Sequence, residues 1–383
     1  MAIYLDNAAT SHPKPEAVYR AADRTLRELG ASPGRGSYRA AIEASRLLFE
    51  TRLAAARLFG ITDAARIVFT ASATEALNLA LFGLLNPGDG VVTTSMEHNA
   101  VLRPLELLRQ RSVQITKVTA DRNGFVLPAD IMAACAERPR LLVLSHCSNV
   151  TGTRQAIEEI GPWCRKQGIL LLVDAAQSAG LFDLDVEAMA IDLLAVPGHK
   201  GLFGPPGTGL LYVREGLQIR PLLIGGNGGD SAAALPSPQL PEGLESGTVN
   251  SSGLAGLKAG IEFLLATGLD TIRRHELNLL RHLRQELPKI PGLQLHGADA
   301  MERQGSALSF TLDGHDPAAI AFLLDRDYDI QTRAGLHCAP DAHRSIGTFP
   351  QGTVRVSPGW FNNEQHIKHL LKALTELAIS QRG

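Results

Sequence analysis

The sequence predicts an α/β protein with a mostly parallel sheet of seven strands, followed by a smaller α+β unit. Short apolar runs separated by helical patterns lie between residues 54 and 213, and we read these runs as lacking apolar–polar alternation. Such strands are typical of a parallel sheet that helices cover on both faces. The seven runs are Ile67–Phe69, Val91–Thr93, Val113–Val118, Leu141–Leu144, Leu170–Val173, Leu193–Val196 and Gly209–Val213.

The chain changes character after these runs. Residues 225–248 are rich in Gly, Pro and Ser without an apolar period, which indicates a long exposed excursion. Helical patterns and short strand-like pieces then mix, so we expect a large domain over residues 15–260 and a small α+β domain of residues 1–14 and 261–383. The expected elements are helices at Leu254–Leu265, Leu269–Leu287 and Glu364–Leu377, and strands at Ala307–Leu312 and Thr353–Ser357.

The composition narrows the range of possible functions. The 383 residues carry 37 Lys and Arg against 39 Asp and Glu, so no basic field exists to attract nucleic acid or an anionic membrane. The N-terminus lacks a signal pattern and no apolar run could span a bilayer, so a cytoplasmic location is expected. The four cysteines are too few and too scattered for a disulfide framework.

An acid and a lysine follow two of the expected strands. Asp174 comes directly after Leu170–Val173, and Lys200 comes shortly after Leu193–Val196. Since ligands bind beyond the carboxyl ends of parallel strands, we expect both side chains at one edge of the sheet. Pyridoxal phosphate (PLP) needs a lysine amine for its imine and a carboxylate beside its ring nitrogen. Either residue alone is more often a helix cap or an exposed lysine, but the pair favours a PLP site.

A turn rich in small residues follows the strand that ends at Phe69. Ser72, Ala73, Thr74 and Glu75 lead there into a helical run. The pattern predicts a capping box, and a capped helix N-terminus can also bind a phosphate group.

Other polar side chains could bind an amino-acid substrate or the PLP cofactor. His98 follows a strand and offers a flat ring that could stack on a pyridine, although a lone histidine is more often structural. Asn149 offers a side-chain amide or is an ordinary turn residue. Arg333 and Arg355 indicate bidentate binding of a carboxylate, with surface ion pairing as the alternative for each.

Cys338 lies between His337 and a proline-containing turn. An imidazole neighbour can lower the pKa of a thiol or carry its proton, whereas an isolated cysteine is usually a small buried apolar residue. A metal site at His337, Cys338 and His343 would lack a fourth ligand and the usual spacing, so no metal is expected.

Motifs spread over nearly the whole chain resemble the class V aminotransferase superfamily and, within it, the cysteine desulfurase and selenocysteine lyase family. The cysteine motif is similar to that of the second group of desulfurases. The motifs are Leu5-Asp-Asn-Ala-Ala-Thr10, Val173-Asp-Ala-Ala-Gln177, Gly198-His-Lys200, Glu245-Ser-Gly-Thr248 and Arg333-Ala-Gly-Leu-His-Cys-Ala339.

The resemblance implies the type I fold of PLP-dependent transferases and a role for each matching cofactor residue. Lys200 would bond PLP as a Schiff base, Asp174 would pair with the ring nitrogen, His98 would stack on the ring and Gln177 would touch its phenolic oxygen. The implied cofactor-binding set is Ala73, Thr74, His98, Asp174, Gln177, His199, Lys200 and Thr248.

The resemblance implies that residues of two subunits bind the phosphate group of PLP, and therefore that the protein is a homodimer. Thr74 and His199 would hold the phosphate from one subunit and Thr248 would reach it from the other. Pro197 and Ala73 replace two hydroxyl residues that are common in relatives, and Ser72 with backbone N–H groups would compensate.

The resemblance also implies the reaction. Arg355 and Asn149 would fix the substrate carboxylate with Arg333 close by, and Cys338 would take the sulfur of L-cysteine as a persulfide, leaving L-alanine. A sulfur-acceptor protein would be a further partner. Open alternatives are a selenocysteine lyase, an epimerase, a kynureninase-like hydrolase or an aminotransferase in which Cys338 has no covalent role, and a non-catalytic scaffold.

Overall fold

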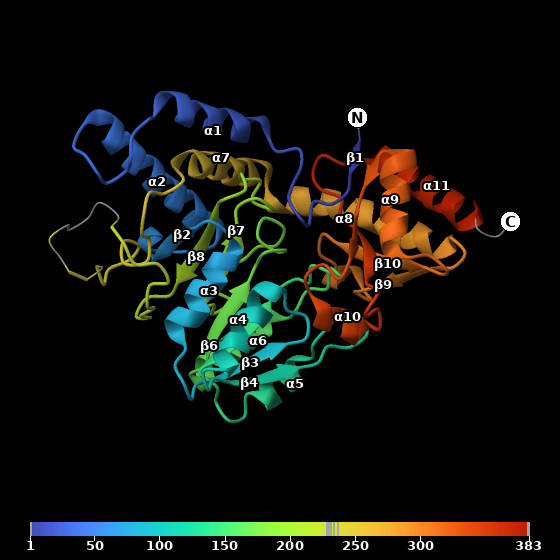
Figure 1. Cartoon of the computed structure of the whole chain (residues 1–383), viewed down its shortest axis with the longest axis horizontal. Helices are drawn as coiled ribbons and strands as arrows, with labels where there is room; N and C mark the ends of the chain where they lie inside the picture. The colour runs from blue at the N-terminus through green and yellow to red at the C-terminus, as the bar shows by residue number, and fades with distance from the viewer. Residues whose placement is uncertain (1, 227–231, 233, 236, 381–383) are drawn as a thin grey trace.

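The central sheet confirms the predicted fold class. A computed structural model describes residues 2–226, 232, 234–235 and 237–380 (Figure 1). Its main sheet has the order β2-β8-β7-β6-β5-β3-β4, in which β8 is antiparallel to both neighbours and the other pairs are parallel. All seven apolar runs form strands: β2 (Ile67–Thr70), β3 (Gly90–Thr94), β4 (Gln114–Val118), β5 (Leu141–Ser145), β6 (Leu170–Asp174), β7 (Leu193–Pro197) and β8 (Gly209–Val213).

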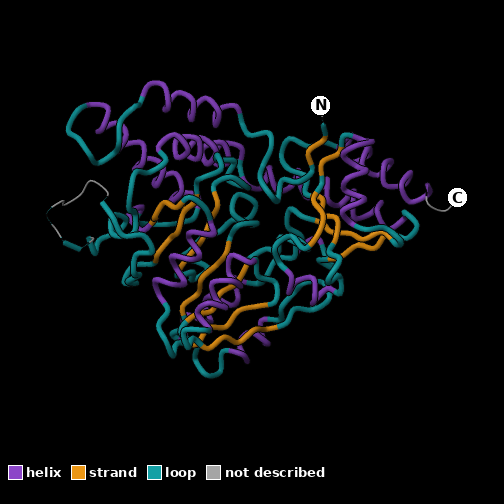
Figure 2. The backbone as a smooth tube through the Cα atoms, in the orientation of Figure 1, coloured by secondary structure: helices purple, strands orange, loops and turns teal. Residues whose placement is uncertain are grey.

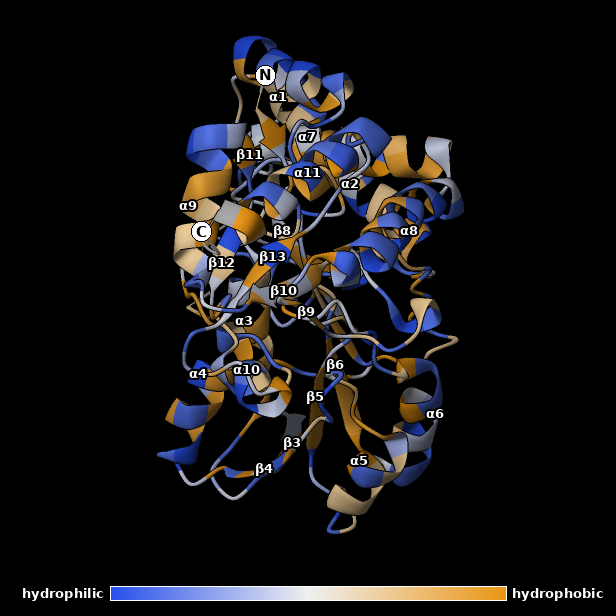
Figure 3. Cartoon of the chain, turned by 90° about the vertical axis from the view of Figure 1, so that its right-hand side faces the viewer, coloured by the Kyte–Doolittle hydropathy of each residue, from blue (hydrophilic) through white to orange (hydrophobic). Residues whose placement is uncertain are grey.

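Helices cover both faces of this sheet, which explains why its strands read as continuous apolar runs. In β5, Leu141 and Val143 pack into one hydrophobic cluster with α3 and α4, whereas Leu142 and Leu144 pack into another with α2, α6 and α7. Figure 3 shows the resulting apolar strands between helices with polar outer faces. The helices are α1 (Glu16–Glu28), α2 (Arg39–Leu58), α3 (Ala73–Leu84), α4 (Asn99–Arg109), α5 (Pro128–Ala134), α6 (Ile157–Gln167) and α7 (Ser251–Thr267).

Strand β4 departs from the expectation of full burial. It lies at the edge of the sheet and pairs with β3 alone, and Gln114, Thr116 and Lys117 are exposed. The expectation that every run is buried on both faces is therefore wrong for this strand, because an edge strand has a neighbour on one side only.

The C-terminal part of the chain forms a second layer with its own core. Its antiparallel sheet has the order β12-β13-β10-β9, and Figure 2 shows its strands apart from the central sheet. The strands are β9 (Leu293–His296), β10 (Leu308–Leu312), β12 (Arg333–Gly335) and β13 (Thr353–Val356); the helices are α8 (Leu269–Glu286), α9 (Pro317–Tyr328), α10 (Pro340–Ile346) and α11 (Glu364–Ser380). Short 3-10 helices lie at Ala64–Arg66, Leu287–Lys289 and Met301–Arg303.

The N-terminus lies with this second layer. Strand β1 (Ile3–Tyr4) pairs in parallel with β11 (Ile330–Gln331), and the chain then crosses to the central sheet (Figure 1). The expected domain boundary at residue 260 falls inside α7, which continues across it. The two-domain division itself stays a prediction.

The excursion expected over residues 225–248 holds no helix or strand in the residues that the structure describes there. Residues 227–229 of its glycine run lie outside the described residues.

Candidate active site

A pocket lies at the edge of the central sheet where the carboxyl ends of several parallel strands meet. It contains about 520 Å³ of space free of protein atoms, part of which is open to solvent. The residues that line it follow β2, β3, β5, β6 and β7. The structure thus brings together eight of the predicted residues: Ala73, Thr74, His98, Asn149, Asp174, Gln177, His199 and Lys200.

Asp174 and Lys200 are the two charged groups in the wall of this pocket. Burial raises the pKa of Asp174, although the N–H of Ala176, 2.9 Å from its Oδ1, and Lys200 oppose the shift. Burial lowers the pKa of Lys200 to about 8, against the opposing charge of Asp174. Within the described residues, no ion pair shorter than 4.0 Å joins them. A buried carboxylate and a readily deprotonated amine on one pocket fit a ligand with a basic ring nitrogen and a carbonyl group, as PLP has.

His98 is held as a neutral ring. It is the N-cap of α4, and its Nδ1 accepts a hydrogen bond from the N–H of Ala100 at 3.0 Å, which assigns the remaining proton to Nε2. Burial lowers its pKa to about 4, and the positive charges of Lys200 and Arg333 add to this effect. Burial likewise lowers the pKa of His199 to about 4. Both imidazoles are therefore uncharged at neutral pH.

The N-terminus of α3 forms one end of the pocket. The Ser72 hydroxyl accepts the N–H of Glu75 at 3.2 Å, as the capping-box pattern predicts. The Glu75 carboxylate, however, accepts the N–H of Ala71 at 2.6 Å and not that of Ser72, so the box closes one residue earlier than expected. Ser72, Ala73 and Thr74 all line the pocket, which places a helix N-terminus where an anion could bind.

A polar network joins the pocket to the second layer. The side-chain amide of Asn149 donates a hydrogen bond from Nδ2 to the His337 carbonyl oxygen, 2.6 Å away in the Cys338 loop. The backbone carbonyl of Asn149 accepts a hydrogen bond from Arg355 Nη1 at 2.8 Å. Arg355 Nη2 lies 2.6 Å from Asp6 Oδ1. Arg333 stands opposite Arg355 in the pairing of β12 with β13, so the two predicted arginines are neighbours.

Cys338 is exposed and tethered through its backbone. Both His337 and Cys338 adopt left-handed conformations, with φ of 48° and 59°. The Cys338 carbonyl accepts the N–H of Asn99 at 2.7 Å, and Asn99 directly follows His98. Arg333 Nη2 lies 3.9 Å from the Cys338 sulfur.

The His337 ring is neutral and contacts a residue other than the neighbouring thiol. It is buried, burial lowers its pKa to about 2, and its ring contacts Thr353 Oγ1 at 3.2 Å. An uncharged imidazole cannot stabilise a thiolate as a cation would, and transfer of the thiol proton by His337 stays a prediction. Arg333 is the cation that the structure places near the sulfur.

Thr248 does not line this pocket. It borders a separate groove that Phe49 of α2 also lines. Its contact with the phosphate of a second subunit stays a prediction.

Two acidic residues near the site, Asp6 and Glu97, received no role from the sequence. Asp6 belongs to Leu5–Thr10, and Glu97 immediately precedes His98. Glu97 is fully buried; its carboxylate accepts the N–H and hydroxyl of Ser145 at 2.9 and 2.8 Å and the hydroxyl of Thr94 at 2.6 Å. The available signals were the place of Asp6 in the Leu5–Thr10 motif and the place of Glu97 next to His98.

No helix in the described part of the chain has both the length and the apolarity needed to cross a bilayer.

Comparisons with known proteins place this chain among related enzymes. The sequence model of the family described as Aminotransferase class-V matches residues 3–370. A probable cysteine desulfurase of Methanothermobacter thermautotrophicus is 37% identical over 98% of this chain and 94% of its own length. The apo structure of a cysteine desulfurase from Thermococcus onnurineus matches with a TM-score of 0.92 at 32% identity, covering 99% of this chain and 95% of that one. The cysteine desulfurase CsdA of Escherichia coli matches with a TM-score of 0.87 at 28% identity, covering 99% and 95%.

Proposed function

Because this chain belongs to the class V aminotransferase family and, within it, to the cysteine desulfurases, we propose that it converts L-cysteine to L-alanine with Cys338 as sulfur acceptor. The family is PLP-dependent, and the pocket residues fit that cofactor. Lys200 would hold it covalently, Asp174 would lie at its ring nitrogen, and the neutral ring of His98 would stack on it.

PLP, when bound, supplies an electron sink that stabilises negative charge on the carbon atoms of an amino acid. The residues of the chain supply position and protons. Lys200, with a pKa of about 8, is partly an amine at neutral pH and can accept or return a proton. Gln177 would contact the phenolic oxygen. Ser72, Thr74 and the free N–H groups of α3 would bind the phosphate in place of the hydroxyl groups that Pro197 and Ala73 lack.

Arg355 and Asn149 would hold the substrate carboxylate, with Arg333 nearby. The Cys338 thiolate then attacks the substrate sulfur: a sulfur–sulfur bond forms, the carbon–sulfur bond breaks, and a proton takes the place of sulfur on the β carbon. The products are a Cys338 persulfide and L-alanine, so no external oxidant or reductant is needed.

The observation that carries this proposal is the placement of Cys338. Its thiol is exposed, its sulfur lies 3.9 Å from the Arg333 guanidinium, and its carbonyl is bound by the residue next to His98. An epimerase or a hydrolase needs no such cysteine.

A homodimer is part of the proposal. Helix α2 exposes Ile42, Phe49 and Leu53, and the groove that Phe49 lines also holds Thr248. A second copy packed on this apolar face would bury it and bring Thr248 to the neighbouring pocket.

We also propose a cytoplasmic location and a protein acceptor for the sulfur. All four cysteines, which lie in the described residues, are free, as suits a reducing compartment. The exposure of Cys338 would let an acceptor thiol reach its persulfide.

Replacing Cys338 with Ala tests the central step. Sulfide and alanine are assayed together with L-cysteine and a reductant, and the wild type should form both in equal amounts. Cys338→Ala should keep the yellow cofactor colour and lose sulfide release, whereas Cys135→Ala, which alters a cysteine outside the pocket, should keep it. Wild-type sulfide release by Cys338→Ala would overturn covalent sulfur transfer.

A further inference from the structure

The guanidinium of Arg355 already binds a carboxylate of the chain itself. Its side chain is 1% exposed, and Nη2 lies 2.6 Å from Asp6 Oδ1, in an ion pair whose carboxylate partner is 18% exposed. Nη1 donates to the Asn149 carbonyl at 2.8 Å, and the buried Nε has no hydrogen-bond partner among the described residues. Two of the five N–H groups of the guanidinium are thus occupied, and the Nε–H group is among those left for another acceptor.

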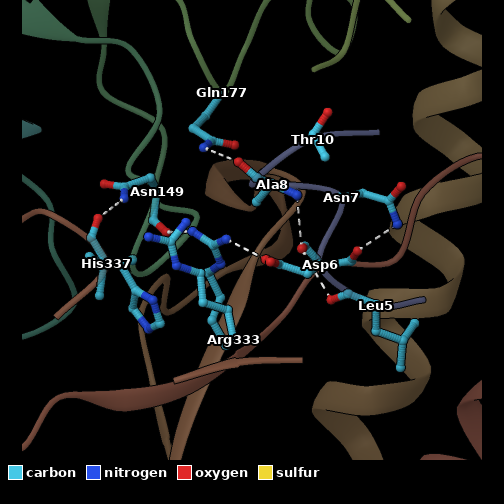
Figure 4. A network of polar contacts seen from close by, with 12 residues as sticks. Leu5, Asp6, Asn7, Ala8, Thr10, Asn149, Gln177, Arg333 and His337 are labelled. Atoms are coloured by element: carbon cyan, nitrogen blue, oxygen red, sulfur yellow. Dashed lines mark hydrogen bonds and ion pairs between the residues drawn. The ribbon is translucent and has the colours of Figure 1, made fainter. Parts of the chain in front are cut away.

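Asp6 is fixed on the segment that crosses from the second layer to the central sheet. Its backbone forms a bridge with Ser357, and its carbonyl accepts the Tyr4 hydroxyl at 3.0 Å. Two residues on, Ala8 donates its N–H to the Ser357 hydroxyl at 2.9 Å and accepts Gln177 Nε2 at 2.9 Å (Figure 4). The backbone of Asp6 is therefore held from both sides, and its carboxylate stays within reach of Arg355.

The electrostatics of the pair bear on any ligand that carries a carboxylate. Burial lowers the pKa of Arg355, and the negative charge of Asp6 opposes this effect. Asp6 is the acidic partner that the described residues supply to Arg355. With these two charges cancelling, Arg333 is left to attract a carboxylate, so the field at the site is weaker than two free arginines would give.

We propose that Asp6 is a resident counter-carboxylate that competes with the amino-acid carboxylate for Arg355 and so keeps the affinity low enough for the product to leave. This inference rests on the proposed function, in which Arg355 binds that carboxylate. The exchange replaces one carboxylate by another, so the buried guanidinium always has a negative partner and no proton has to move.

The consequence is a loss of affinity shared by substrate and product. Asp6 contacts the arginine and not the reacting atoms, so it lowers the binding of L-cysteine and L-alanine alike. Asp6→Asn keeps the shape of the side chain and removes its charge. It should therefore bind both amino acids more tightly, and L-alanine should become a stronger product inhibitor.

Calorimetric titration of the holoenzyme with L-alanine tests this inference. Asp6→Asn should bind L-alanine at least about 5-fold more tightly than the wild type, the lower end of typical coupling between linked sites. Asp6→Glu, which keeps the charge, should not bind more tightly. Asp299→Asn makes the same charge change at an exposed side chain paired with Arg303 and should match the wild type. If Asp6→Asn does not fold, Asp6→Ser provides the same comparison.

Arg355→Ala separates failure of this inference from failure of the proposed function. Weaker L-alanine binding in Arg355→Ala together with tighter binding in Asp6→Asn supports both. Weaker binding in Arg355→Ala with unchanged or weaker binding in Asp6→Asn overturns the competition and leaves the carboxylate site in place. Unchanged binding in Arg355→Ala overturns both, because the carboxylate would then bind elsewhere.

Discussion

Replacing Glu97 with Gln should make the protein more stable at neutral pH and above, but not in acid. The carboxyl group is fully buried next to His98, and burial raises its pKa from 4.5 to about 7, against the hydrogen bonds from Thr94 and Ser145 and with a smaller contribution from the charge of Asp174. Keeping it ionised in the folded state is therefore unfavourable. The pKa difference, 7 − 4.5 = 2.5, corresponds to roughly 3 kcal/mol at 1.36 kcal/mol per pH unit.

The sign of the pH dependence follows from proton binding. Below the unfolded pKa the group is protonated in both states and contributes nothing. Between 4.5 and about 7 the folded protein binds more protons than the unfolded chain, so stability falls as the pH rises. Above about 7 the carboxylate is ionised in both states and the full penalty is present. Gln cannot ionise, so the variant escapes this loss.

The assay is urea unfolding of wild type and Glu97→Gln at intervals from about pH 4 to about pH 8. The difference in unfolding free energy should grow by roughly 3 kcal/mol in favour of the variant over this range. Glu137→Gln, at an exposed position, should show no such growth. A difference that stays constant with pH would refute the reasoning, because it would mean that burial does not disfavour the Glu97 carboxylate.

Further changes test the site and its surroundings. Borohydride reduction and peptide mapping should find the pyridoxyl group on Lys200, and a label on another lysine would contradict the assignment. Gly180→Ala should cost roughly 2–4 kcal/mol, because φ is +82° and a Cβ would lie 2.2 Å from the Gly201 carbonyl oxygen. Gly216→Ala, with φ of +80° and open space, should cost about 1 kcal/mol when both variants are unfolded in urea; equal losses would exclude the clash as the cause. Phe49→Asp should give monomers in sedimentation, and an intact dimer would place the interface elsewhere.

The sequence was sufficient to predict the central sheet because its strands are buried on both faces. Leu141–Leu144 reads as one apolar run since alternate residues pack into different clusters, and the same holds for most of the sheet. Burial patterns were less informative for β4, whose edge position depends on the strand order and not on its own residues. The two-residue strands β1 and β11 are too short to give any period.

The pocket was predictable for a similar reason. Residues at the carboxyl ends of parallel strands share one edge, so Asp174, Lys200 and His98 could be grouped from their positions alone. The contact between Asp6 and Arg355 spans 349 positions and depends on how the second layer meets the N-terminal segment, for which the sequence holds no local signal. The neutral state of His337 likewise follows from burial that its neighbours in sequence do not indicate.

The uneven exposure of the cysteines has a practical consequence. All four lie in the described residues; Cys135, Cys147 and Cys164 are buried, and burial raises their pKa values to about 11, 12 and 12, whereas Cys338 is exposed. A thiol-selective fluorophore should therefore attach at a single position without any mutagenesis. The natural chain thus provides its own site-specific handle, and because the label would occupy the thiol proposed to accept sulfur, the loss of sulfide release on labelling would count the active sites.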